Sequence, residues 1–412
     1  MRKAIVCGKL FDAKDGKVSK NKVIRIVGNK IESVEDFEDM EILKECNSDE
    51  ILDYSDMFVM PGLIDAHLHL GFGGNTAIVE IHEPSELVCL KAVKNAQDNL
   101  LGGFTTVRDV GFPSLMGGQA VRDAINLGYA WGPRVFSCGT YITQTGGHLA
   151  TSYPQDRFGQ QSFKPVNTAD SADEVRTACR YMLKMGVDQI KIMVTGGVLS
   201  NSGGVGEQNM SYDEIVAAVE VCKMHNKLLS CHAHGLSGIK DAAKAGVSSI
   251  EHCTMVDDEG IEYMLKNHVV AVPTFNVLKV LAAGEAFGVA KSSADKAASL
   301  IPYHINNIKK AYDRGVRIVF GSDTGTPLGF HGKQHPEFAL MVNAGISVED
   351  TLLSATRYAA EMISWDDKIG TIENGKLADI IAIDGDPTVD ITCINSSNIS
   401  LVVKDGVVYR NR

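Results

Sequence analysis

The chain has 412 residues, of which 44% are apolar and 22% charged, so it holds enough apolar residues for a packed core. At roughly 100–200 residues per domain, this length predicts two or three domains, or one large barrel with a smaller appended domain. The 40 basic and 51 acidic residues give a formal net charge of −11. Nucleic acids and anionic membrane surfaces attract the opposite balance, so neither is an expected partner.

Targeting segments and cysteine pairs are not evident in the sequence. The first residues, MRKAIVCGKL, lack the apolar segment of a secretory signal, and no apolar run reaches the ~18 residues that span a bilayer. The nine cysteines are spaced singly, without a Cys-x-x-Cys motif. The simplest interpretation is a reduced, cytoplasmic protein with mostly buried thiols.

Both ends of the chain predict short β-strands. Near the N-terminus, apolar runs at 4–7, 23–27 and 30–34 are separated by Asp-Gly and Gly-Asn turn signals. Near the C-terminus, a run at 379–383 precedes a hairpin signal, in which 401–404 and 407–409 flank Asp405-Gly406. Neither end is long enough for a core of its own. We therefore expect residues 1–57 and 369–412 to combine into one small β-domain.

The middle of the chain, residues 58–368, alternates strand-like and helix-like segments. Eight short apolar runs are candidate strands: 63–66, 104–107, 134–137, 189–194, 228–231, 248–251, 269–272 and 317–320. Helix-period stretches lie between most of them, at 85–101, 171–185, 211–225 and 349–362, with capping-box signatures at Ser171/Glu174 and Ser211/Glu214. This alternation predicts a (β/α)8 barrel. A doubly wound open sheet is the alternative, but no GxGxxG follows the first strand.

Two histidines end the first candidate strand, where a barrel enzyme carries its catalytic side chains. His67 and His69 lie in GLIDAHLHL, and residues two apart in a strand point the same way. Both imidazoles should therefore face the barrel mouth and share one metal ion, while Leu68 faces the helices. Chance is the alternative, because a His-x-His pair alone is a weak signal.

Lys191 lies in the fourth candidate strand, QIKIMV, where it and Met193 should face the barrel interior. A lysine in that position must be neutralised, paired or modified. It could extend to the rim or pair with an acid. Near several histidines of the metal-binding type, carboxylation by CO2 is attractive, because it creates an anionic oxygen donor that can bridge two cations.

Further histidines follow later strands. His232 and His252 end the fifth and sixth strands, and two consecutive strands ending in His favour metal ligation over hydrogen-bonded core histidines. His234 shares a face with His232 but lies further along, so we interpret it as a substrate contact. His148, in the Gly-rich loop TQTGGHLA, is a second candidate for substrate contact. The others are interpreted as ordinary histidines: His82, His225, His268, His304, His331 and His335.

Asp323 ends the eighth candidate strand, in RIVFGSD. A carboxylate there can ligate a metal and accept a proton from metal-bound water, whose pKa the metal lowers to ~7. The alternative is a helix-capping Asp before the Thr-Gly loop. Four histidines, one aspartate and a modified lysine are six N and O donors, which suit two ions such as Zn²⁺. No phosphate-binding P-loop or G-x-S-x-G motif competes with this interpretation.

These motifs resemble the amidohydrolase superfamily, in the branch of imidazolonepropionase-like enzymes and metal-dependent Xaa-Pro and Xaa-Arg dipeptidases. The resemblance rests on PGLIDAHLHL, GGFTTVRDVG, TGGH, KIMVTGGV, HAHG, SIEHC, GSDTGTP and the tail TRYAAEMI…IGTIENGKLADIIAIDGDP. It implies a TIM barrel with a small β-sandwich built from both termini, and a homo-oligomer. It also implies one metal at His67, His69 and Asp323 and a second at His232 and His252, with carboxylated Lys191 and a hydroxide bridging them.

The sequence therefore predicts a binuclear zinc hydrolase of an amide bond in a dipeptide or an N-acyl amino acid. The bridging hydroxide would attack the carbonyl, Asp323 would carry the proton to the leaving nitrogen, and His148 and His234 would position the substrate. Related peptidases often have Tyr where this chain has His234.

Three alternatives stay open at this point. A cyclic-amide or lactone hydrolase and a deaminase belong to the same superfamily, and the retained Lys191 argues against a mononuclear deaminase. A metal-carrying scaffold without catalysis is the non-enzymatic alternative. The segment 275–300 looks helical and is a candidate wall or lid of the site.

Overall fold

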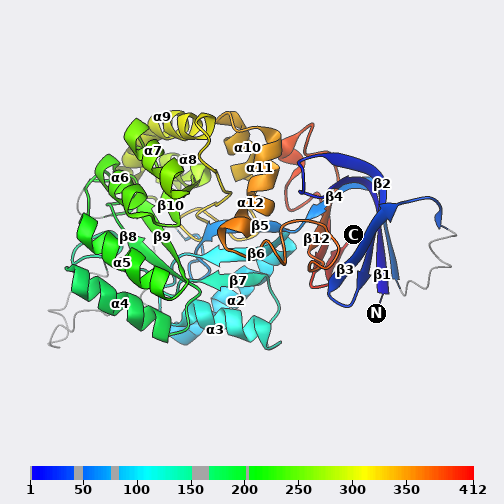
Figure 1. The fold of residues 1–412 in the computed structure, drawn as a ribbon, viewed down its shortest axis with the longest axis horizontal. Coiled ribbons are helices and arrows are strands. Elements are labelled where there is room, and N and C mark those ends of the chain that lie inside the picture. The colour runs from blue at the N-terminus through cyan, green and yellow to red at the C-terminus, as the bar shows by residue number, and fades with distance from the viewer. Residues whose placement is uncertain (1, 41–49, 76–82, 151–166, 201–203) are drawn as a thin grey trace.

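The computed structural model describes residues 2–40, 50–75, 83–150, 167–200 and 204–412. Figure 1 shows two parts: a β-sheet that holds both chain ends, and a larger part in which helices surround strands. Cys46 and His82, which the sequence analysis interpreted as an unpaired thiol and an ordinary histidine, lie outside the described residues.

Strands from both ends of the chain form one seven-stranded sheet, in the order β14-β13-β12-β4-β1-β2-β3. The strands are β1 (Arg2–Phe11), β2 (Val18–Val27), β3 (Lys30–Asp36), β4 (Glu50–Pro61), β12 (Ile380–Ile383), β13 (Ile399–Lys404) and β14 (Val407–Asn411). The hairpin predicted around Asp405-Gly406 joins β13 to β14. Asp405 and Gly406 have φ values of 51° and 70°, which is the pair of positive φ angles that a type I′ turn requires.

Apolar side chains from distant strands of this sheet share one core. Ile26 of β2 and Ile31 of β3 lie in a buried cluster with Leu401 and Val403 of β13, although these strands lie toward opposite edges of the sheet. The sheet therefore curls around the cluster. A sandwich of two separate sheets is not confirmed, because the strands belong to a single hydrogen-bonded sheet.

Seven parallel strands of the larger part form two further sheets. The three-stranded sheet holds β5 (Leu63–Leu68), β6 (Phe104–Asp109) and β7 (Arg134–Ser137); the four-stranded sheet holds β8 (Gln189–Met193), β9 (Leu228–Ala233), β10 (Ser249–His252) and β11 (Val270–Val272). Soon after β7, Ile142 N donates to Lys191 O at 2.8 Å, so the chain that follows β7 contacts β8. Parallel strands have their carboxyl ends on one side, which gathers the residues that end them.

The expected eighth strand, 317–320, is not assigned as a strand in the structure. Ile318 makes an isolated parallel bridge with Ala271 of β11, and Ala66 N of β5 donates to Phe320 O at 3.0 Å. These contacts place the segment between β11 and β5. The α/β class is confirmed, but the assigned sheets do not close into a ring.

The helices lie around the outside of these strands (Figure 1). They are α2 (Ser85–Leu101), α3 (Gly117–Asn126), α4 (Ala172–Lys184), α5 (Tyr212–Met224), α6 (Leu236–Ala245), α7 (Asp258–Asn267), α8 (Phe275–Ala282), α9 (Lys291–Asp313), α10 (Pro336–Asn343), α11 (Val348–Ser354) and α12 (Arg357–Met362), with 3₁₀ turns η3 (Gly284–Phe287) and η4 (Ile391–Cys393). The capping box at Ser211 and Glu214 forms as predicted. The single helix expected over 349–362 is instead two, because Thr356 leaves the helical region with φ −135° and ψ −101°.

Cysteine usage and hydropathy agree with the sequence analysis. Eight of the nine cysteines lie in the described residues, where all are free thiols and six are buried. Across the same ranges, no helix is both long and apolar enough to cross a bilayer.

Candidate active site

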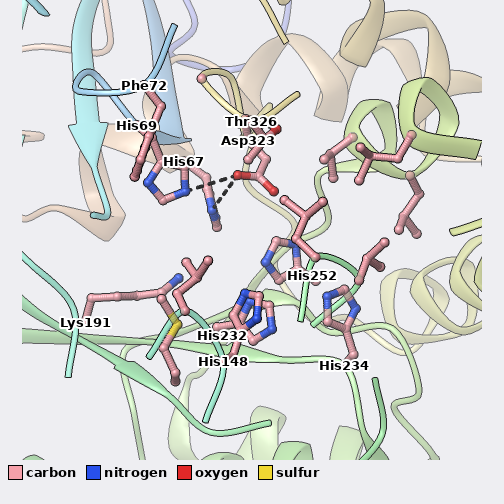
Figure 2. A pocket seen from close by; sticks show the side chains of 18 residues that line it. His67, His69, Phe72, His148, Lys191, His232, His234, His252, Asp323 and Thr326 are labelled. Atoms are coloured by element: carbon pink, nitrogen blue, oxygen red, sulfur yellow. Dashed lines mark hydrogen bonds and ion pairs between the residues drawn. The ribbon is translucent and has the colours of Figure 1, made fainter. Parts of the chain in front are cut away.

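All eight side chains predicted as ligands or substrate contacts line one pocket: His67, His69, His148, Lys191, His232, His234, His252 and Asp323. His67, His232 and His252 lie in the last residues of β5, β9 and β10, and Lys191 lies in the middle of β8. The strand geometry therefore brings these four side chains together. Figure 2 shows His67, His69 and Asp323 on one side of the pocket and His148, His232 and His234 on the other.

His67, His69 and Asp323 form the first cluster of donors. Asp323 Oδ1 lies 3.4 Å from His67 Nε2 and 3.2 Å from His69 Nε2. His69 Nδ1 lies 2.8 Å from the carbonyl oxygen of Gly111, which holds a proton on Nδ1 and turns Nε2 toward Asp323. Leu68, between the two histidines, packs in the main core, so the predicted alternation of the strand is confirmed.

His232, His234 and His252 form the second cluster. The rings of His232 and His252 have centroids 4.6 Å apart, and the His234 ring stacks on His252 at 4.6 Å with an interplanar angle of 10°. His148 stacks on the other side of His232 at 4.2 Å, and its Nδ1 lies 2.7 Å from Ser200 Oγ. The loop after β7 therefore carries its histidine to the edge of the cluster.

Lys191 reaches the pocket from β8 and is only 1% exposed. Met193, two residues on, lines the same pocket, while Ile190 and Ile192 pack in the core, as the strand alternation predicts. Burial lowers the pKa of the Lys191 amine below its usual value, and the nearby Glu251 carboxylate opposes that shift. The amine is therefore held at a site that disfavours its charge.

The backbone is strained where these residues leave their strands. His252 has φ 68°, Asp323 has φ 58° and Thr274, just after β11, has φ 53°. Left-handed φ values are uncommon outside glycine, and for a β-branched residue such as threonine they are outliers. Such strain persists where the surrounding structure fixes it, and it concentrates at functional sites.

For His69, burial is outweighed by the contact with Asp323, which raises the pKa of that ring. Burial keeps four other pocket histidines neutral. It lowers the pKa of His148 and of His234 to about 3, and it lowers the pKa of His232 and of His252 well below the usual range. Neutral imidazoles carry the free lone pair that a metal ion needs. Asp323 behaves differently: burial raises its pKa, but His67 and His69 outweigh burial and hold the pKa well below its ordinary value.

A buried ion pair that the sequence analysis missed supports the first cluster. Glu251 Oε2 lies 2.7 Å from His67 Nδ1, and Arg108 Nη2 donates to both oxygens of Glu251 at 2.7 and 2.8 Å. Arg108 and Glu251 are 1% and 0% exposed. Glu251 directly precedes His252, and Arg108 is the second-last residue of β6. Their place near strand ends was the signal, but the sequence does not show that they pair.

The donor set fits divalent cations. His67, His252 and Asp323 have ligand atoms that all lie within 4.8 Å of one another, and the same holds for His232, His234 and His252. All of these residues are buried, and imidazole with carboxylate is a donor set that suits Zn²⁺. The second group includes His234, which the sequence analysis had interpreted as a substrate contact.

Comparison with known proteins agrees with the geometry of the pocket. A model of the amidohydrolase family matches residues 58–409. The chain belongs to the amidohydrolase family. Ochratoxinase from Aspergillus niger is 30% identical over 374 residues, which cover 85% of this chain and 75% of that protein. Imidazolonepropionase from Fusobacterium nucleatum subsp. nucleatum is 24% identical over 369 residues, covering 84% and 81%.

A solved structure extends the match to the whole fold. A Xaa-Pro dipeptidase with methionine bound in its active site has a TM-score of 0.91 to this amidohydrolase, is 35% identical, and is covered completely, as is this chain. The resemblance inferred from the motifs is therefore confirmed. The protein is a metal-binding hydrolase that acts on carbon–nitrogen bonds, and the family supports amide hydrolysis in general.

Proposed function

We propose that this amidohydrolase is a binuclear enzyme that cleaves the amide bond of a dipeptide or an N-acyl amino acid. The observation that carries the proposal is the convergence of two donor clusters, with buried Lys191, in one pocket at the carboxyl ends of the strands. The similarity to a Xaa-Pro dipeptidase over the whole chain favours a small linear amide as substrate.

We propose that residues 58–368 make a (β/α)8 barrel and that residues 1–57 with 369–412 make a separate β-sandwich domain. The bridges of Ile318 to β11 and of Ile142 to β8 support the barrel, since they join neighbouring parts of a ring. The cluster shared by Ile31 and Leu401 supports the sandwich, because a strongly curled sheet faces itself across its core.

The ligands of the two ions are assigned as the sequence predicts. His67, His69 and Asp323 would hold one Zn²⁺, and His232 and His252 would hold the other, with carboxylated Lys191 between them. When bound, the ions supply Lewis-acid polarisation of the substrate carbonyl and an activated water. The neutral state of His232 and His252 and the ionised state of Asp323 suit this role.

The chain's own residues complete the reaction. Asp323 would take the proton of the attacking water and deliver it to the leaving nitrogen, since its oxygens lie in the pocket and are not tied up in a cap. Glu251 and Gly111 fix the rings of His67 and His69. His148 and His234 would contact the substrate at the edge of the second cluster.

Metal analysis and a substrate library test the proposal together. We expect about two equivalents of metal per chain, as a two-ion site requires. We also expect turnover of linear dipeptides or N-acyl amino acids. Asp323→Asn should lower kcat by about 10²–10⁴ because it removes the proton carrier. Asp313→Asn, the same change at the exposed end of α9, is the matched control. One equivalent of metal or fewer, or unchanged turnover in Asp323→Asn, contradicts the scheme.

The same library tests a second candidate function, hydrolysis of a cyclic amide, which the similarity to imidazolonepropionase favours. It includes a cyclic amide and a lactone beside the linear amides. Ring opening that is faster than cleavage of every linear amide would favour the cyclic-amide hydrolase.

A further inference from the structure

Part of the catalytic pocket is lined by apolar side chains that the proposed chemistry does not use. Val277, Leu278 and Leu281 come from α8, and Val198 and Leu199 come from the loop after β8. These five residues are named here the apolar wall. Behind it, Val289, Ala297 and Leu300 of the following turn and α9 join Val198 and Leu281 in one buried cluster, so the wall is backed by a packed layer.

Charged side chains are few among the described residues that line the pocket. Among the described residues that line it, Lys191 and Asp323 are the only Lys, Arg, Asp or Glu. Lys296 of α9 does not line the pocket, and its Nζ donates to the carbonyl oxygen of Ser200 at 3.0 Å. A charged substrate side chain placed on the wall would lose its hydration without gaining a partner among the described lining residues, which is costly.

We propose that the substrate carries a large, uncharged apolar side chain beside the scissile bond, and that Leu278 and Leu281 select it by packing. This inference rests on the proposed amide hydrolysis and adds the chemistry of the substrate. Apolar contact is roughly proportional to the area removed from water, so leucine, methionine and phenylalanine side chains gain most from such a wall.

The position of the wall depends on Glu337, a buried residue of α10. Thr274 precedes α8 but does not cap it, because its hydroxyl oxygen lies 2.7 Å from His252 Nδ1. Glu337 supplies the missing acceptors: its carboxylate oxygens accept hydrogen bonds from Phe275 N at 2.8 Å and from Asn276 N at 2.7 Å. Glu337 is therefore a positioning residue that fixes the first turn of α8, and with it the wall.

Two dipeptide series test the substrate class with the Zn²⁺-loaded protein. One varies the residue on the acyl side (X-Ala) and the other varies the residue on the amine side (Ala-X), with X as Leu, Phe, Gly, Arg or Asp. We expect kcat/KM in at least one series to be roughly tenfold or more higher for Leu and Phe than for Arg and Asp, as burial of an apolar side chain predicts. Hydrolysis without that preference in either series overturns the inference and leaves the proposed function standing.

Binding measurements decide the case in which neither a dipeptide nor an N-acyl amino acid is hydrolysed, which would contradict the proposed function. Isothermal titration of the Zn²⁺-loaded protein with L-leucinamide and L-argininamide then tests the wall alone. Tighter binding of L-leucinamide by roughly tenfold supports it. Equal binding, tighter binding of L-argininamide, or no binding of either compound overturns it.

Truncation of the wall provides the second arm. Leu281→Ala should reduce the preference for Leu over Gly about tenfold, mainly through KM, because it removes contact area and no reacting group. Leu353→Ala in α11 is the matched control, since Leu353 is a buried helical leucine that does not line the pocket. The same loss of preference in Leu353→Ala, or an unchanged preference in Leu281→Ala, would overturn the role of the wall.

Glu337 is tested by the same selectivity ratio. Glu337→Ala leaves Phe275 N and Asn276 N without acceptors and should lower the preference for Leu over Arg, while Glu337→Gln, which keeps one carbonyl acceptor, should restore part of it. A folded Glu337→Ala protein with the original preference would overturn the positioning role. If Glu337→Ala does not fold, the comparison of Glu337→Gln with the unsubstituted protein decides in the same way.

Discussion

The donor clusters and the apolar wall share one pocket but are built in different ways. The donors come from four strands and from loops, and the rings of His67, His69 and His252 are fixed by hydrogen bonds to Glu251, Gly111 and Thr274. The wall comes mainly from α8, whose Val277, Leu278 and Leu281 belong to the apolar cluster behind it. Directional bonds tolerate little displacement, whereas apolar packing accepts other residues of similar volume. We infer that chemistry is fixed in one region and substrate choice is adjustable in the other.

Removal of metal should have the largest effect on activity, because it disables the donor clusters and leaves the apolar wall intact. Dialysis against a chelator should lower kcat by about 10³ or more, since the ions provide several kcal/mol of transition-state stabilisation. Zn²⁺ should restore activity. Circular dichroism at each stage is the control: the helical signal should persist, because the core does not include the donors. Full activity without metal would contradict the proposed site.

Glu251→Gln removes the carboxylate that orients His67 and pairs with Arg108. The change leaves the Arg108 guanidinium buried without its anionic partner, so urea unfolding should show a loss of about 3–5 kcal/mol. Affinity for Zn²⁺ should fall about 10–100-fold, because Glu251 also orients His67.

Glu220→Gln is the matched control for that variant. The Arg176–Glu220 ion pair has a similar length, 3.0 Å, but its side chains are 32% and 46% exposed. Its loss should cost about 0–1 kcal/mol and leave the metal affinity unchanged. Equal destabilisation by the two variants would contradict the importance of the buried pair.

Much of the donor region was predictable from the sequence, because a strand of known direction fixes which residues share a face. His67 and His69 could be assigned to the pocket from their spacing together with their place at the end of a candidate strand, and Lys191 with Met193 from the same alternation. The prediction of an eighth strand at 317–320 was wrong. The segment around Ile318 is apolar enough for a buried strand, but it makes only one assigned bridge. Alternation predicts a direction, not the completeness of pairing.

The supporting contacts were not predictable, because they join residues far apart in the chain. Arg108 and Glu251 are 143 positions apart, and Glu337 and Phe275 are 62 apart. Local periodicity says nothing about which of several buried charged residues meet. The segment 275–300 was expected to be helical and to serve as a wall or lid, and α8 does line the pocket, but its anchor on α10 follows only from the folded structure.

Glu337 also makes the anchor of the wall sensitive to pH. Burial raises the pKa of Glu337 to about 8, with smaller contributions from Asp65 and Asp323, while the N–H groups of α8 oppose the shift. Because the folded state holds the proton more tightly than the unfolded chain, this group's contribution to stability falls as pH rises from about 4.5 to about 8. The difference in unfolding free energy between the native chain and Glu337→Gln should change by up to ~1.4 kcal/mol per pH unit in that window.

Urea unfolding at several pH values measures this difference. Glu373→Gln is the control, because it removes a partly exposed carboxylate whose pKa is lowered. Its difference in unfolding free energy should not fall over the same range. A flat difference for Glu337→Gln between pH 5 and 8 would show that the carboxylate is ionised throughout.

Thr274 joins the two regions, and its substitution should have the smallest effect. Thr274→Val keeps the branched side chain at φ 53° but removes the hydroxyl that contacts His252 Nδ1, so the stability loss should be about 1 kcal/mol. Zn²⁺ affinity should weaken, because the His252 ring loses the partner that orients it. The preference for Leu over Arg should persist, since Glu337 still caps α8. Thr274→Ser, which retains the hydroxyl, should keep the Zn²⁺ affinity. If Thr274→Val instead altered the preference for Leu over Arg and left the Zn²⁺ affinity unchanged, Thr274 would position the wall and not the His252 ring. The separation of donors and wall that we infer would then be wrong.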